Sequence, residues 1–130
     1  MSIQACRISL YGYKFDFYEP IFKDIPIDIE GEYVDVWGIP TGYYDLQYWK
    51  NTKPYQNSCL VYISDGMNAD YKYIGYLKRA TYIENTLGDN FWEIEPRFDE
   101  WVMKRTKPNI EMILRKELGE PQLFTFDHYQ

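Results

Sequence analysis

Three acidic side chains at alternating positions form the clearest chemical pattern in the sequence. Asp28, Glu30 and Glu32 are two residues apart. On a β-strand, such residues point to the same face at a spacing of about 6.6 Å. Carboxylates on one face can bind hard divalent cations, or they can form a negative row that attracts a basic protein. The simplest role for such a row is solvation of a strand face.

A divalent-metal-dependent hydrolase needs two or three carboxylates that converge on the cation. Asp65 and Asp70 flank a second loop, but that loop lacks the ligand spacing of an EF-hand, and no His or Lys accompanies the acids in a recognisable pattern. Residues 38–42 lack the Lys-Ser/Thr of a P-loop and the glycine spacing of a dinucleotide fingerprint. We therefore expect no catalytic residues, no metal and no cofactor, and we keep a metal-dependent hydrolase as a second alternative.

Acidic residues are concentrated in one part of the chain. Between residues 16 and 45, eight acids stand against a single base, Lys23. The net charge of -6 and the pI of about 4.8 argue against a nucleic-acid binder, because Lys and Arg make most contacts with phosphates. Carboxylates bordered by aromatic rings are typical of an inhibitor or immunity-type protein that blocks a basic, nucleic-acid-handling partner by mimicking nucleic acid. The expected contact residues are Asp28, Glu30, Glu32, Tyr33, Asp35 and Trp37.

The aromatic content offers an alternative to a protein-binding module. The chain has 14 tyrosines and 4 tryptophans, and 19% of its residues are aromatic. Most of these rings are expected to pack a sheet, since Tyr and Trp have an apolar body and a polar tip. A group of four could instead stack on a small ligand or a carbohydrate. These residues are Tyr43, Tyr44, Tyr48 and Trp49.

The cysteines and the single histidine give little support for nucleophilic catalysis. Cys6 and Cys59 lie in apolar segments without the CxxC spacing of a zinc or redox site, and we expect buried free thiols. A disulfide would form only if their strands were neighbours. His128 falls in an expected C-terminal tail over residues 127–130, where a catalytic geometry would be poorly held.

Hydrophobic periodicity places several strands in the first two thirds of the chain. Residues 3–17 alternate as one strand, or as two with a bend near Gly12, and residues 25–37 as an edge or first strand that begins near Pro26. Residues 44–49 suit a short helix or a strand. The segments 59–63 and 71–77 surround a loop rich in Asp, Gly and Asn and predict a β-hairpin.

The last third of the chain changes to a helical period. A helix is expected to begin at Pro96 and to carry Trp101 and Val102, until Pro108 interrupts it. A second helix is expected over residues 109–118, followed by a terminal strand over residues 122–126.

Together these patterns predict one α+β domain over residues 1–130. It would contain an antiparallel sheet with a central hairpin and two C-terminal helices packed on one face. No apolar segment has the length of a signal sequence or a membrane span, so we expect a cytoplasmic protein. The expected function is binding of a basic protein rather than catalysis, without direct contact to nucleic acid or membrane.

Overall fold

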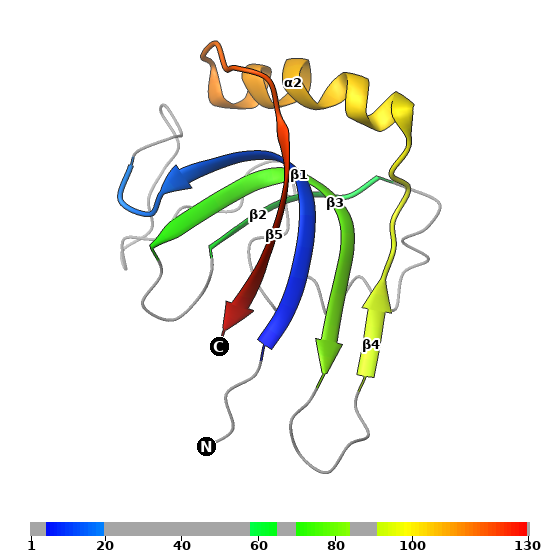
Figure 1. Ribbon diagram of the computed structural model, residues 1–130. Coiled ribbons are helices and arrows are strands. Elements are labelled where there is room, and N and C mark those ends of the chain that lie inside the picture. Colours follow the sequence, from blue (N-terminus) through cyan, green and yellow to red (C-terminus); the bar gives the residue numbers. More distant parts are fainter. Residues whose placement is uncertain (1–4, 20–57, 65–69, 84–90, 130) are drawn as a thin grey trace.

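The computed structural model describes residues 5–19, 58–64, 70–83 and 91–129 (Figure 1). The elements in chain order are β1 (Ala5–Asp16), β2 (Leu60–Ser64), β3 (Tyr71–Ile83), β4 (Phe91–Ile94), α2 (Glu100–Leu114) and β5 (Gln122–Tyr129). The strand predicted over residues 25–37 and the segment 44–49 lie outside the described residues. In the described part, no helix is long and apolar enough to cross a membrane.

The strands of the described residues form one antiparallel sheet. Four of them follow the order β2-β3-β1-β5, and β4 also pairs with β3. The predicted hairpin is present as the β2–β3 pair, and β3 continues beyond residue 77 to Ile83. This extension gives β3 room for two partners on one edge, because β2 pairs with residues 72–76 and β4 with residues 80–83. The short strand β4 was not predicted from the sequence.

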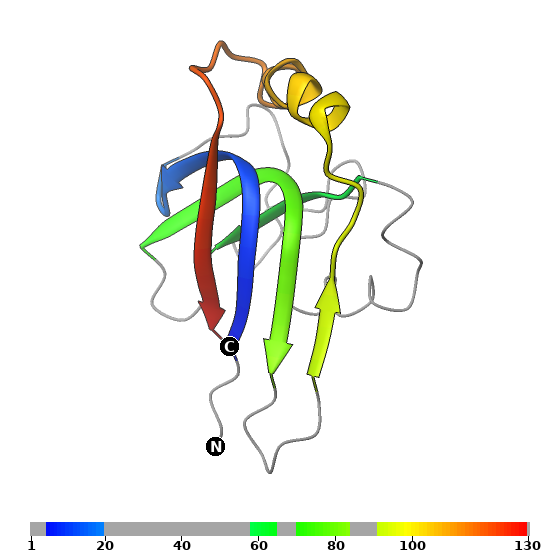
Figure 2. The same ribbon diagram turned by 45° about the vertical axis from the view of Figure 1, so that its right-hand side comes forward.

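The two long central strands bend together, as Figures 1 and 2 show for β1 and β3. The register shifts between the pairs Ser9↔Arg79 and Leu10↔Leu77, so that Lys78 is an extra residue in β3. A bulge of this kind increases strand twist and allows a sheet to turn a corner. Just beyond it, Gly12 faces Gly75, and a Cβ atom at either position would collide with the backbone of the opposite strand. The bend therefore requires two residues without side chains.

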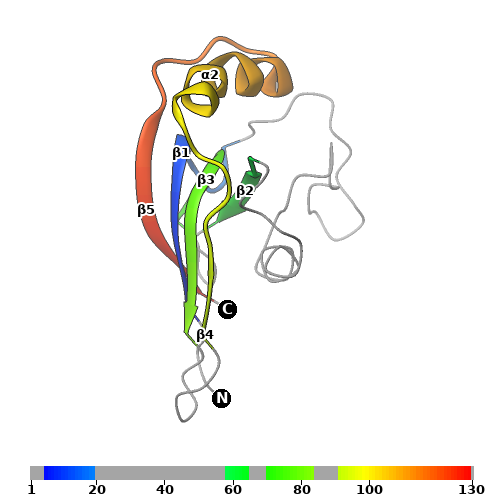
Figure 3. The same ribbon diagram turned by 90° about the vertical axis from the view of Figure 1, so that its right-hand side faces the viewer.

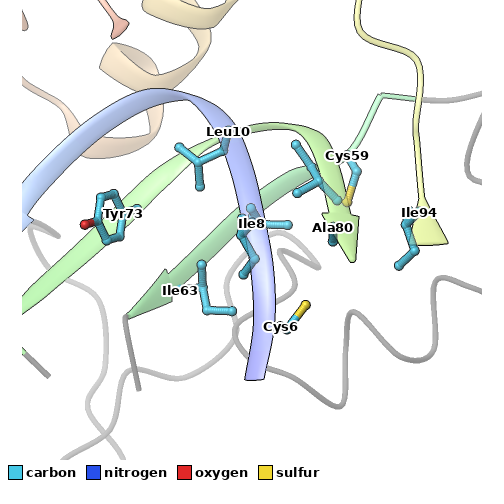
Figure 4. Packing of buried hydrophobic residues seen from close by; sticks show 10 residues of the cluster. Cys6, Ile8, Leu10, Cys59, Ile63, Tyr73, Ala80 and Ile94 are labelled. Carbon is cyan, nitrogen blue, oxygen red and sulfur yellow. The ribbon is translucent and has the colours of Figure 1, made fainter. Parts of the chain in front are cut away.

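The main hydrophobic core lies inside this bend. It contains Ile8 and Leu10 from β1, Val61 and Ile63 from β2, and Leu77 from β3, all at most 1% exposed. Figure 4 shows side chains of the three strands pointing toward one another. Alternating apolar residues on each strand supply these groups, as period-two patterning predicts.

The edge strand β5 closes one side of this core. The ring of Phe126 stacks on Tyr73 with centroids 3.8 Å apart and planes within 7°. Figure 3 shows β5 and β2 on opposite sides of β1 and β3. β5 extends through residue 129, so the prediction of a C-terminal tail over residues 127–130 was wrong.

The prediction of two C-terminal helices was wrong, because the described residues contain a single helix, α2, which runs through Pro108. The buried residues Val102, Thr106, Ile110 and Leu114 recur every four positions on both sides of the proline. One continuous face therefore packs on the sheet, while Pro108 is exposed. Thr106 completes this face because its hydroxyl donates to the Val102 carbonyl, 3.0 Å away.

Both ends of α2 differ from the sequence-based expectation. The helix begins after Asp99, whose carboxylate accepts a hydrogen bond of 3.0 Å from the Val102 amide, and not at Pro96. It ends at Arg115, which has a left-handed backbone with φ of 55°. α2 packs with Ile110 and Leu114 against Tyr13 and Ile74, in a second cluster on the other side of the sheet from the main core.

Candidate functional site

The residues predicted to bind a partner or a ligand all lie outside the described residues. This applies to the acidic row with its aromatic neighbours, Asp28, Glu30, Glu32, Tyr33, Asp35 and Trp37, and to the aromatic group Tyr43, Tyr44, Tyr48 and Trp49. The described residues nevertheless contain a surface of the same chemical type. It lies where β1 ends and β3 begins.

Two segments that are distant in the sequence meet at this surface. At the end of β1, the Glu19 amide donates to the Asp16 carbonyl at 3.0 Å and closes a turn. The Phe17 amide donates to the Asp70 carbonyl, also at 3.0 Å, and this bond extends the pairing of β1 with β3. We name this region the acidic–aromatic surface. It consists of Asp16, Phe17, Tyr18, Glu19, Asp70 and Tyr71.

Aromatic rings are exposed on this surface. Tyr18 is 90% exposed, whereas Phe17 and Tyr71 are each 37% exposed. The rings of Phe17 and Tyr18 meet edge to face with centroids 5.1 Å apart. The Lys14 ammonium lies 3.7 Å from the centre of the Tyr71 ring. Large exposed rings of this kind can provide apolar contact area to a partner.

A buried lysine, Lys72, holds the turn that carries these residues. Lys72 is 3% exposed, and its ammonium donates a hydrogen bond to the backbone carbonyl of Glu19. Burial lowers the pKa of Lys72, and the nearby Lys116 acts in the same direction, while Glu19 opposes the change. Lys72 therefore holds the Glu19 backbone in place, and the side chains of Asp16 and Glu19 are exposed.

Several other acidic residues of the described part form ion pairs with Arg or Lys. Arg7 binds Asp127 through two hydrogen bonds, of 2.9 and 3.3 Å. Arg79 lies 2.8 Å from Glu93, which shares a hydrogen bond with Glu95; this bond lowers the pKa of Glu93 and raises that of Glu95. In contrast, none of the ion pairs between described residues involves Asp16 or Glu19.

An open groove of about 390 Å³ lies between α2 and the segment before β5. Its charged groups neutralise one another, since Lys104 pairs with Glu100 and Lys107 with Glu120, each at 3.2 Å. The remaining lining residues are Tyr11, Met103, Pro108 and Pro121. This groove lacks a group of unusual reactivity, and it gives no reason to assign a reaction.

The histidine and the two cysteines contribute to the packing and hydrogen bonding of the fold. His128 is 7% exposed, and its Nδ1 donates to the Ser64 carbonyl at 2.6 Å, which joins β5 to β2. The prediction of buried free thiols is confirmed for Cys6 and Cys59. Burial raises the pKa of each thiol to about 12, so both are protonated at neutral pH. No group of three or more potential metal ligands occurs among the described residues.

No protein-family model matches the chain, and no curated protein or solved structure matches it either.

Sequence reasoning found part of the acidic–aromatic surface. Asp16 and Glu19 belong to the acidic stretch of residues 16–45, but Phe17 was assigned only to the predicted strand over residues 3–17. The contact with Asp70 and Tyr71 depends on the pairing of β1 with β3. In this pairing Asp16 faces Tyr71, which lies 55 positions later in the chain. Period-two patterning cannot identify such a pair, because it does not specify which strands are neighbours.

Proposed function

We propose that this protein is a binding module for a basic protein partner, of the inhibitor or immunity type. In this proposal the acidic–aromatic surface makes the contact together with the acidic row at residues 28–35. Carboxylates would steer the partner and exposed aromatic rings would supply the buried contact area. The partner would be a protein that handles nucleic acid, since such a protein presents a positive surface to phosphates.

The distribution of charge is the observation that carries this proposal. The described residues include 11 of the 14 Lys and Arg and 11 of the 20 Asp and Glu, so their formal net charge is zero. The whole excess of -6 belongs to the other segments, where nine acids stand against three bases. A charge needed only for solubility could be spread over the whole chain. Between residues 16 and 45, eight acids stand against one base, and this local concentration, which includes Asp16 and Glu19, favours a binding role.

The exposed tyrosine strengthens the argument. Tyr18 is 90% exposed even though the Phe17 ring meets it edge to face. Tyr and Trp are enriched among residues whose truncation weakens interfaces most. Tyr18 would therefore act as an anchor within a ring of carboxylates.

The proposal is tested by capture and affinity measurement. Immobilised protein should retain a basic protein from a lysate of the source organism, and the purified pair should bind less tightly as salt rises. Tyr18→Ala should raise Kd about tenfold or more. The double variant Asp16→Lys/Glu19→Lys should raise it further, through both lost attraction and new repulsion.

Matched variants outside the acidic–aromatic surface serve as controls. Leu123 of β5 is 50% exposed, so Leu123→Ala should leave Kd unchanged. Glu95→Lys/Glu100→Lys makes the same change in net charge as the acidic double variant on two exposed residues and should have a smaller effect. If only neutral or acidic proteins were captured, or if Kd were independent of salt, the proposed function would be rejected.

A further inference from the structure

The solvent side of α2 carries a second surface with exposed aromatic and apolar groups. Trp101, Arg105, Pro108 and Met112 follow one another at helical spacing on the face turned away from the sheet. Trp101 is 47% exposed and Met112 is 70% exposed. We name these four residues the α2 outer stripe. A helix with a buried face and this second apolar face is expected to contact another molecule.

Two guanidinium groups give the α2 outer stripe a positive character around Trp101. The Arg105 guanidinium lies 3.7 Å from the ring centre and that of Arg97 lies 4.6 Å away. Arg97 also pairs with Asp99 at 2.8 Å. Arg105 has no carboxylate partner among the described residues and donates one hydrogen bond, of 3.1 Å, to the Trp101 carbonyl.

This geometry prepares Arg105 to bind a carboxylate. The indole ring and the Trp101 carbonyl fix the guanidinium plane, which reduces the entropy lost on binding. Most of its five N–H donors remain available, and a carboxylate can accept two of them at once. The α2 outer stripe therefore suits a surface in which carboxylates lie beside aromatic rings.

We propose that the α2 outer stripe binds the acidic–aromatic surface of a second copy of this chain. The carboxylates of Asp16 and Glu19 would meet Arg105, and Tyr18 would pack near Trp101. Figure 1 shows the start of α2, the end that carries Trp101 and Arg105, and the end of β1 on opposite sides of the molecule. These two parts of one copy therefore do not meet. Charge complementarity between them thus favours a contact between copies.

The contact joins two different surfaces, so it is heterologous and can propagate into short head-to-tail chains. It would also cover the surface that the proposed function assigns to a basic partner. Partner binding and self-association would then compete. The inference itself does not depend on the existence of that partner, because self-association is measured with the purified chain alone.

Complementation between two variants tests this contact. Sedimentation velocity of the wild-type chain from about 10 µM to about 500 µM should show a mass that rises with concentration, as for a weak interface. Arg105→Glu and Asp16→Lys/Glu19→Lys should each remain monomeric. An equal mixture of the two variants should form a two-chain complex, because each supplies the surface that the other lacks.

Controls separate this contact from a general effect of charge. Lys78→Glu makes the same charge change as Arg105→Glu on an exposed residue of β3 and should still self-associate. Circular dichroism should show that every variant is folded. Wild-type protein that stays monomeric throughout the range would overturn the proposal, even if an acidic peptide bound to α2. Folded variants that fail to complement each other would overturn it as well.

Discussion

At the scale of single residues, the side chains with reactive groups serve the fold. Cys6 and Cys59 are at most 1% exposed within the main core, and His128 joins the two outer strands β5 and β2. The sequence allowed prediction of the buried thiols, because both cysteines lie in apolar segments. It did not allow prediction of the role of His128, because the terminal strand continues beyond the apolar residues 122–126.

The thiols should make the protein sensitive to alkali. Their pKa is raised from 9.0 to about 12, so they contribute stability that is fully present below pH 9 and is lost as the pH rises toward 12. Cys6→Ala/Cys59→Ala should reduce the free energy of unfolding at pH 7 by about 2 kcal/mol through cavity formation. Its stability should then decline less steeply than that of the wild type above pH 9, as measured by urea unfolding. Parallel declines in the two proteins would contradict this prediction.

At the scale of elements, the bend in β1 and β3 determines the arrangement of the core, the helix and the acidic–aromatic surface. The bend encloses the core and supports α2, and the outer ends of the same strands form the acidic–aromatic surface. A bend near Gly12 could be predicted from the sequence. The match of Gly12 with Gly75 could not, because it depends on a register that is fixed only when the strands pair.

The paired glycines should be intolerant of side chains. Gly12→Ala and Gly75→Ala each place a Cβ against backbone atoms of the opposite strand and should cost about 3 kcal/mol or prevent folding. Gly119→Ala is the matched control, since its Cβ would have no atom within 4 Å. That change should alter stability by less than about 0.5 kcal/mol in thermal unfolding. Normal stability in either variant of the pair would show that the bend has another origin.

The continuity of α2 shows why a proline is an uncertain signal. Pro108 predicted two helices, but four-residue spacing of the buried face continues through it. The packing of this buried face on the sheet therefore outweighs the loss of the backbone hydrogen bond that a proline cannot donate. Thr106 obscured this spacing in the sequence, since a threonine is not usually counted with apolar residues.

Replacing this proline should stabilise the protein. Pro108→Ala restores a backbone N–H within the helix and should raise the free energy of unfolding by about 1–3 kcal/mol. Pro96→Ala provides a comparison, because Pro96 is buried before the helix and its loss should be destabilising. Chemical denaturation measures both changes. An unchanged or lower stability of Pro108→Ala would indicate that the proline costs the helix nothing at this position.

At the scale of the whole molecule, charge is distributed unevenly along the chain, with eight acids and one base between residues 16 and 45. The described residues have a formal net charge of zero, and the acidic excess begins where β1 ends. Sequence reasoning identified this imbalance, because charge can be counted along a chain. It did not identify the acidic–aromatic surface, because that surface depends on the register of β1 and β3. It also did not identify the α2 outer stripe, because that stripe depends on one helix that continues through Pro108.

Hydrogen–deuterium exchange of the protein, alone and with its captured basic partner, tests the central claim most directly. Both samples should be measured at a concentration where the free chain is monomeric. The proposed function predicts slower exchange on binding in peptides that cover residues 16–19, 28–37 and 70–71, with little change in α2. Protection confined to α2 or to β5, with unchanged exchange at residues 16–19 and 70–71, would contradict it.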